Sequence, residues 1–174
     1  MYGDETRAKT VLYTALFAAL IAVGGWISLP VFAVPFTLQS LFVILASCVM
    51  HKKAVYPVLL YVGAGLLGLP VFHNGLSGIG VLFGPTGGFL LGFIPAAFIA
   101  GVLFAKEKDI AAAVSAVLIY DAAAVLWFML TASASFPAAF IACVLPYLAG
   151  DAAKAAAAVL AARCSCRPPS SEDA

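Results

Sequence analysis

Long apolar runs, separated by short connections, dominate the sequence. A helix needs roughly 20 mostly apolar residues to cross the hydrocarbon core of a bilayer. On this criterion the pattern predicts six membrane-spanning helices: Val11–Leu29, Pro35–Met50, Ala54–Phe72, Phe89–Ala105, Ile110–Leu130 and Ala138–Ala162. The second run is the shortest and has the least defined ends. The first run lacks a cleavage pattern and is too long for a removable signal peptide, so we interpret it as a spanning helix.

Composition supports a membrane protein without an appreciable soluble domain. Of the 174 residues, 64% are hydrophobic and only 10% are charged, and the mean hydropathy is +1.11. A soluble domain carries about 25% charged residues. So few charges cannot form a water-exposed surface, so we expect lipid to cover most of the exterior. The formal net charge of +1 does not indicate nucleic-acid binding.

Basic residues occur in every second connection. Pairs of them precede the first run, separate the second from the third and the fourth from the fifth, and follow the sixth: Arg7, Lys9, Lys52, Lys53, Lys106, Lys108, Arg163 and Arg167. Connections rich in Lys and Arg stay in the cytoplasm. The pattern therefore predicts an all-α bundle with both termini inside. Residues 1–10 would form a cytoplasmic N-terminus, residues 11–162 one spanning domain and residues 163–174 a cytoplasmic tail.

The connection between the third and fourth predicted helices is not an ordinary loop. Residues 73–88 include six glycines and several large apolar side chains, but no Asp, Glu, Lys or Arg. Loops this long are uncommon, and backbone at membrane depth must pair within the protein or line a cavity. We favour a lid over an outward-facing cavity, with a flexible connector as the alternative. The lid residues of interest are Gly84, Pro85, Thr86, Gly87 and Gly88.

Three charged residues fall inside the predicted spans. Asp151 and Lys154 are three positions apart, so they share one helix face. An isolated charge at the bilayer centre costs at least ~2.5–3.5 kcal/mol and usually marks a functional site, although a pair that only fixes packing is the alternative. Asp121 can pair with Lys154, line a cavity or be neutral. Thr37 and Gln39 lie near the start of the second predicted helix. They can be a polar pair that begins this helix, or they can contact a ligand, and the two interpretations are equally good.

Signatures of catalysis are absent from the sequence. It contains neither the G-x-x-x-x-G-K-[ST] nucleotide loop nor the H-E-x-x-H zinc motif. Both His residues lie in predicted connections, and Cys164 and Cys166 have too few neighbouring ligands for a metal site. We therefore expect no enzyme activity, no cofactor and no metal. An intramembrane enzyme using Asp121 and Asp151 as an acid–base pair is one alternative, and a purely structural membrane subunit is another.

Four segments of the sequence carry a resemblance to a known family: VPFTLQ at 34–39, GLPVF at 68–72, GPTGGFLLGF at 84–93 and LPYLAGDAAK at 145–154. They resemble the BioY family, the biotin-specific substrate-binding components (S-components) of energy-coupling factor (ECF) transporters. They occur in the family's order, and the resemblance covers about residues 10 to 160. Asp121 departs from the apolar residue usual at that point. An S-component for another vitamin is the nearest alternative.

The resemblance implies a six-helix bundle with an outward cavity and a lid between helices 3 and 4. It implies uptake of biotin across the cytoplasmic membrane, with a transmembrane coupling protein and two cytoplasmic ATPase subunits as partners that hydrolyse ATP. It also gives the small residues Ala15, Ala19 and Ala22 of the first helix the role of a docking face for the coupling protein.

Biotin offers a ureido ring, a thioether ring, an apolar chain and a carboxylate. Asp151 can accept ureido N–H bonds, Lys154 can neutralise the carboxylate, and Asn74 and Gln39 can serve as amide partners. With Thr37, these residues form the expected binding site, and the individual pairings can be exchanged. We expect a small, mostly apolar and largely pre-formed cavity.

Overall fold

All six apolar runs fold as helices. The computed structural model describes residues 2–29 and 34–166, so part of the expected tail and of the first outward connection lies outside the described residues. The helices are α1 (Tyr2–Trp26), α2 (Gln39–Met50), η1 (His51–Ala54), α3 (Val55–Leu66), η2 (His73–Gly75), α4 (Ile79–Phe83), α5 (Gly87–Phe104), α6 (Asp109–Ala132), α7 (Phe136–Cys143) and α8 (Leu148–Cys166). Two short antiparallel strands, β1 (Ser28–Leu29) and β2 (Phe36–Thr37), follow α1 and precede α2.

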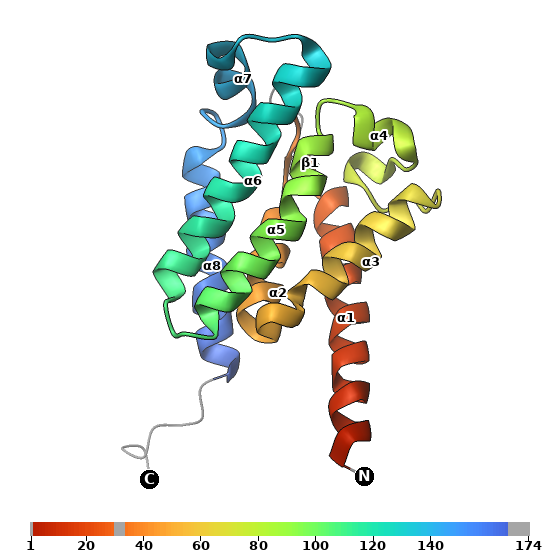
Figure 1. Ribbon diagram of the computed structural model, residues 1–174, viewed down its shortest axis with the longest axis vertical. Helices are drawn as coiled ribbons and strands as arrows, with labels where there is room; N and C mark the ends of the chain where they lie inside the picture. Colours follow the sequence, from red (N-terminus) through yellow and green to blue (C-terminus); the bar gives the residue numbers. More distant parts are fainter. Residues whose placement is uncertain (1, 30–33, 167–174) are drawn as a thin grey trace.

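Small residues allow the helices to pack closely. α5 and α6 run side by side, α8 packs against α2 and α6, and α1 packs against α2 and α3 (Figure 1). A Cβ added at Gly92 of α5 would come within 2.9 Å of the Tyr120 Cα on α6. Ala96, Ala100 and Ala116 are completely buried at the centre of the same core. Small side chains at such positions bring helix backbones together in membranes.

Several helix ends differ from the sequence prediction. α1 begins at Tyr2 rather than Val11, because its polar first turns continue the helix beyond the apolar run. α3 ends at Leu66 rather than at Phe72. The chain turns back just after this end, at Gly68, whose φ is 98°. The buried Phe72 ring then packs under the α3 backbone, where a Cβ at Gly65 would lie 2.2 Å from it.

The sixth predicted helix is not continuous. α7 and α8 are separate helices that meet at an angle of 49°. Pro146 lies in the break, and a proline removes a backbone N–H donor and clashes with the preceding turn. The break starts a new helix, α8, just before Asp151, which lies in its first turn.

Among the described residues, four helices are long and apolar enough to cross a membrane, or five if α7 and α8 form one bent span. In that count, Gln39–Leu66 is a single stretch of 28 residues, because α2, η1 and α3 follow one another without a gap. The helical path nevertheless breaks at His51, where φ is 53° and ψ is −133°, and the chain turns there (Figure 1). α2 and α3 have 12 residues each, about 18 Å of helix, so neither is long enough to be counted as a span by itself. The two predicted spans are therefore counted as one, which lowers the total below six.

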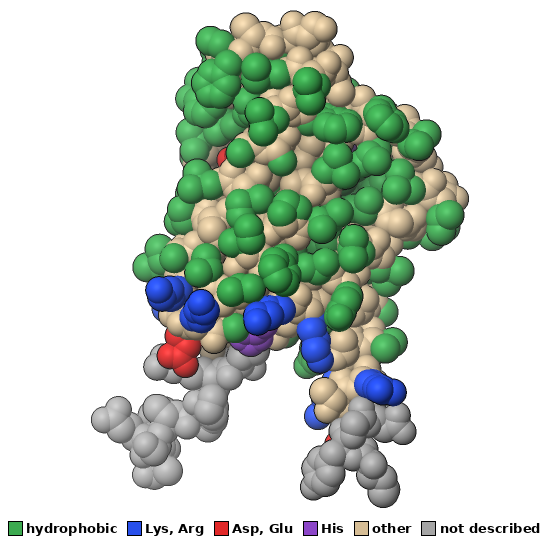
Figure 2. Space-filling view, viewed as in Figure 1, with side chains coloured by type: hydrophobic (Ala, Val, Ile, Leu, Met, Phe, Trp, Pro, Cys, Tyr) green, Lys and Arg blue, Asp and Glu red, His purple; other side chains and the backbone are tan. Residues whose placement is uncertain are grey.

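Positive charge gathers at one end of the bundle. The N-terminal end of α1, η1, the α5–α6 connection and the C-terminal part of α8 lie together, and we call this the basic end (Figure 1). Figure 2 shows Lys and Arg side chains clustered there, whereas apolar side chains are spread over the rest of the surface in this view. This distribution agrees with the alternation of charge along the chain.

Candidate ligand-binding site

A pocket lies in the half of the bundle away from the basic end. It has about 490 Å³ of empty volume, part of which opens to the outside. Its walls come from the start of α2, the first turns of α5, the middle of α6, the start of α8 and the chain around β2.

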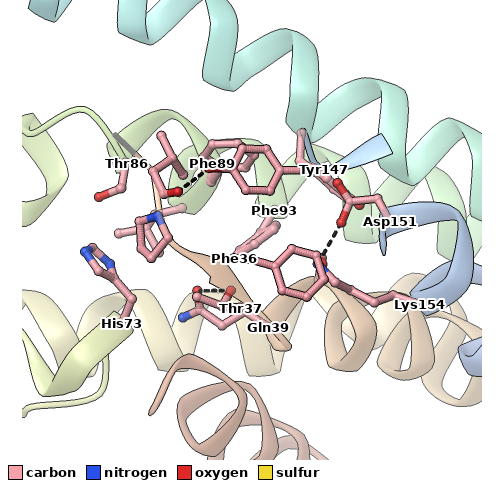
Figure 3. A pocket seen from close by; sticks show the side chains of 15 residues that line it. Phe36, Thr37, Gln39, His73, Thr86, Phe89, Phe93, Tyr147, Asp151 and Lys154 are labelled. Atoms are coloured by element: carbon pink, nitrogen blue, oxygen red, sulfur yellow. Dashed lines mark hydrogen bonds and ion pairs between the residues drawn. The ribbon is translucent and has the colours of Figure 1, made fainter. Parts of the chain in front are cut away.

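A buried ion pair forms one wall of the pocket. Lys154 Nζ lies 2.7 Å from Asp151 Oδ1, and it also donates to Ser40 Oγ at 3.1 Å. The Phe36 ring covers the ammonium, with 3.8 Å between Nζ and the ring centroid (Figure 3). Asp151 lies in the first turn of α8, where the helix dipole favours a carboxylate. The break before α8 therefore places a helix N-terminus, and this acid, at the pocket.

A glycine lets β2 approach α8 at this wall. A Cβ at Gly150 would come within 2.4 Å of the Phe36 ring. Phe36 also stacks on Tyr147, with ring centroids 6.2 Å apart and an interplanar angle of 11°. The Tyr147 hydroxyl donates to the Val34 carbonyl and so ties this aromatic wall to the chain before β2.

An amide and a hydroxyl occupy the wall formed by β2 and α2. Thr37 Oγ1 donates to Gln39 Oε1 at 3.2 Å, and Gln39 Nε2 donates to the Tyr61 hydroxyl. A Cβ at Gly25 would lie 2.7 Å from Gln39 Nε2, so α1 also holds this side chain in place. A primary amide has two donors and two acceptor lone pairs, which leaves Gln39 one of each for a ligand.

Aromatic side chains complete the cavity. Phe93 packs edge-on against Tyr120, with centroids 5.6 Å apart, and Phe89 lies beside the same ring. The Tyr120 hydroxyl is buried and has no hydrogen-bond partner among the described residues. A buried polar atom without a partner is costly, so a ligand that bonds to this hydroxyl would remove the cost.

Four of the five residues proposed for ligand binding meet at the pocket: Thr37, Gln39, Asp151 and Lys154. Asn74 does not, because it is exposed in η2 with φ of 56°, and its neighbour His73 lines the pocket instead. Burial lowers the pKa of His73 below its ordinary value, which favours the neutral imidazole.

Of the proposed lid residues, only Thr86 lines the pocket. Gly87 and Gly88 are buried against other backbone: a Cβ would lie 1.6 Å from the Leu82 carbonyl oxygen at Gly87 and 2.7 Å from the Ala123 carbonyl oxygen at Gly88. Exposed Pro85 lies just outside. The carbonyl of Gly84 accepts a hydrogen bond of 3.1 Å from the Trp127 indole, which anchors the segment to α6.

The sequence argument missed Ser40, His73 and the role of Phe36 over Lys154. Ser40 follows Gln39 directly, and that adjacency was the signal available for it. The ion pair of Lys154 is with Asp151 and not with Asp121. Asp121 is buried in α6 but is not a wall of the pocket, and its Oδ1 has no hydrogen-bond partner among the described residues.

The small residues of α1 do not share one environment. Ala15 and Ala19 are exposed on the outer surface of the helix, whereas Ala22 is buried against the rest of the chain. The predicted docking face is therefore exposed at its first two positions only.

The fold and the site define a multi-pass α-helical membrane protein with a small, partly polar pocket inside the bundle. The BioY family model matches residues 2–168, and the chain belongs to this family. It is 41% identical over 157 residues to the probable biotin transporter BioY of Pyrococcus horikoshii, covering 90% of this chain and 95% of that protein. It is 48% identical over 104 residues to the biotin transporter BioY of Thermotoga maritima, covering 59% and 62%.

A solved structure confirms the fold. The S-component for biotin from an ECF-type ABC transporter matches with a TM-score of 0.84 over 93% of both chains, at 23% sequence identity. The chain therefore has the fold of that S-component. The resemblance carried by the four sequence segments is thus confirmed at the level of family and bundle.

Proposed function

We propose that this chain is the biotin-binding S-component of an ECF transporter and takes up biotin across the cytoplasmic membrane. The observation that carries the proposal is the buried Asp151–Lys154 pair, set among amide, hydroxyl and aromatic groups in a BioY-family bundle. The relatives named above are described as biotin transporters. No cofactor is part of the proposal.

The geometry favours one orientation of biotin. Because Asp151 Oδ1 and Lys154 Nζ are only 2.7 Å apart, they match two neighbouring groups of a ligand, not its opposite ends. A ureido N–H and its adjacent carbonyl are such a pair, with the N–H donating to Asp151 and the carbonyl accepting from Lys154. This placement differs from the initial expectation that Lys154 neutralises the carboxylate.

The carboxylate of biotin then reaches the opposite side of the pocket. His73 and Thr86 lie there, away from the ion pair (Figure 3). Thr86 is the N-cap residue of α5, and a helix N-terminus attracts an anion through its dipole. The aromatic walls between the two ends fit the thioether ring and the apolar chain.

Radiolabelled biotin binding to the purified chain tests the function. We expect saturable binding that unlabelled biotin displaces and that thiamine or riboflavin does not. Absence of saturable binding would overturn the proposal, and displacement by another vitamin would establish the alternative S-component. A biotin amide lacking the carboxylate tests the orientation: Lys154→Met should weaken biotin and the amide by equal factors. If Lys154→Met weakened the binding of biotin but not that of the amide, Lys154 would contact the carboxylate.

The segment 73–88 is proposed to act as the lid. His73 at its beginning and Thr86 near its end both line the pocket, so the segment crosses the opening between them. A spin label at the exposed Ile79 should lose mobility when biotin saturates the pocket. A label at Leu118, exposed on α6, is the control and should not respond. If the mobility of the label at Ile79 did not change, the segment would be only a connector between helices.

We also propose that the basic end faces the cytoplasm and that a coupling protein with two ATPase subunits drives uptake. Lys and Arg at this end follow the rule for cytoplasmic connections. The exposed Ala15 and Ala19 offer a surface of small side chains for a partner helix. Ala19→Trp should abolish transport and complex formation but leave biotin binding intact, while Leu118→Trp should leave all three unchanged. Loss of binding in Ala19→Trp would assign this face to the cavity.

A further inference from the structure

A second pocket lies at the basic end, between α1 and the turn that joins α2 to α3. It has about 860 Å³ of empty volume, part of it open to the outside. Lys9, Lys52, Lys53 and His51 bring basic groups to its walls, and Thr6 and Thr10 bring hydroxyls. Its apolar walls are Tyr13, Val49, Met50 and Ala105, and no Asp or Glu lines it. It is separate from the biotin pocket and shares no wall residue with it.

The fold holds this pocket in shape. The backbone of η1 lies against α5, where a Cβ at Gly101 would come within 2.2 Å of the His51 carbonyl oxygen. Ala54 at the end of η1 is completely buried. Lys53 Nζ donates to Thr10 Oγ1 at 3.1 Å, which ties η1 to α1 across 43 positions of sequence. The basic groups therefore converge through tertiary structure and not only through sequence proximity.

The other basic connection at the same end is different. Lys106 and Lys108 alternate with Glu107 and Asp109, and Asp109 is bound by Arg163. Positive and negative charges nearly balance in that connection. By contrast, neither of the salt bridges found in the described residues involves a lysine of the second pocket. The pocket therefore has a local excess of positive charge beside an apolar surface.

We infer that this pocket binds the phosphate headgroup of an anionic phospholipid from the leaflet at the basic end, with an acyl chain along Tyr13 and Val49. Basic pockets between spanning helices at the membrane boundary recognise anionic headgroups. Lys52 and Lys53 are exposed, and the basic residues border the apolar surface that lipid covers (Figure 2). The combination of lysines, hydroxyls and apolar walls matches a lipid better than a free anion, which needs no apolar contact. This inference does not depend on biotin as the transported ligand.

Lipid binding by the purified full chain in detergent tests the inference. Fluorescent phosphatidylglycerol should bind more tightly than the matched phosphatidylcholine, by about tenfold. Lys52→Gln with Lys53→Gln should remove most of this preference. Lys106→Gln with Lys108→Gln removes the same charge from the same end and should keep it. If the first double variant does not fold, Lys9→Gln, a single change on the exposed side of α1, should reduce the preference about threefold.

Three results would overturn the inference. Equal binding of both lipids by the unmodified chain would exclude a headgroup site. If the two double variants lost the preference for phosphatidylglycerol equally, general surface charge and not this pocket would cause the preference. Displacement of the lipid by millimolar inorganic phosphate would show a free-anion site instead.

Discussion

Helix α8 carries two ion pairs of opposite character. Lys154 and Asp151 are 8% and 5% exposed, and they line the pocket. Arg163 and Asp109 are 55% and 24% exposed at the basic end, with a closest N–O distance of 2.5 Å. Arg163 follows Lys154 by nine residues, roughly 14 Å along the helix. The two contacts have similar lengths, so the surroundings, and not the contact itself, decide what each pair contributes.

The surroundings act through desolvation. Exposed pairs contribute ~0–1 kcal/mol because water and salt screen them. A buried pair offsets a large desolvation cost, and removal of one partner leaves an unpaired charge inside the protein. The buried pair is therefore costly to break, and we propose that a ligand in the pocket uses both charges.

Breaking the buried pair should have the largest effect. Lys154→Met should lower the free energy of unfolding by about 3–5 kcal/mol, because Asp151 loses its partner. The double variant Asp151→Asn with Lys154→Met should recover most of that stability. Thermal or denaturant unfolding of the purified variants measures both changes.

The same double variant should still lose biotin affinity. Each charge-assisted hydrogen bond contributes roughly 1.5–3 kcal/mol, or one to two decades in Kd. If the folded double variant binds biotin as tightly as the unmodified chain, the pair serves packing alone and the site assignment is wrong.

Local patterns in the sequence predicted the features that depend on spacing alone. Asp151 and Lys154 are three positions apart in a helix, so their shared face does not depend on the rest of the fold. The apolar runs likewise predicted where the helices lie, because hydrophobic length determines whether a segment can span a bilayer. Pro146 indicated a loosened helix just before Asp151, but the separation into α7 and α8 was not predicted, because the apolar run continues through the break.

Features that depend on tertiary packing were not predictable in this way. Ala15, Ala19 and Ala22 share a helical face, yet α2 and α3 bury only the last of them. Asn74 and His73 are neighbours in a turn, and the left-handed backbone at Asn74 decides which side chain reaches the pocket. A loop of this kind has no periodicity from which its side-chain directions follow.

Asp121 tests whether burial alone makes an acid functional. It is buried like Asp151, but it forms no salt bridge among the described residues and does not line the pocket. Asp121→Leu removes a buried polar group without a partner at Oδ1, so we expect a gain of roughly 1–3 kcal/mol in unfolding free energy. Biotin affinity should be unchanged. A loss of both stability and affinity would show that Asp121 supports the site.

Tyr120 and Tyr147 offer a matched comparison within the pocket. The Tyr120 hydroxyl has no partner among the described residues, whereas that of Tyr147 donates to the Val34 carbonyl. Tyr120→Phe should raise the free energy of unfolding of the unliganded protein, because it removes a buried hydroxyl without a partner. It should also weaken the binding of biotin by roughly 0.5–1.5 kcal/mol, the contribution of one hydrogen bond. Tyr147→Phe should instead lower stability by a similar amount. Biotin titration and thermal unfolding separate the two effects, and equal behaviour of both variants would show that Tyr120 makes no ligand bond.

The exposed pair on α8 should give the smallest effect. Arg163→Gln leaves Asp109 in contact with water, so the remaining carboxylate stays solvated and costs little. We expect the free energy of unfolding to change by less than about 1 kcal/mol, with biotin affinity unaltered. Added salt should reduce even this difference, because screening acts on exposed charges and hardly on buried ones. Unfolding measured at low and high salt, alongside Lys154→Met, checks both points. A loss in Arg163→Gln as large as that in Lys154→Met would show that the contact itself, and not its burial, determines the contribution of an ion pair in this protein.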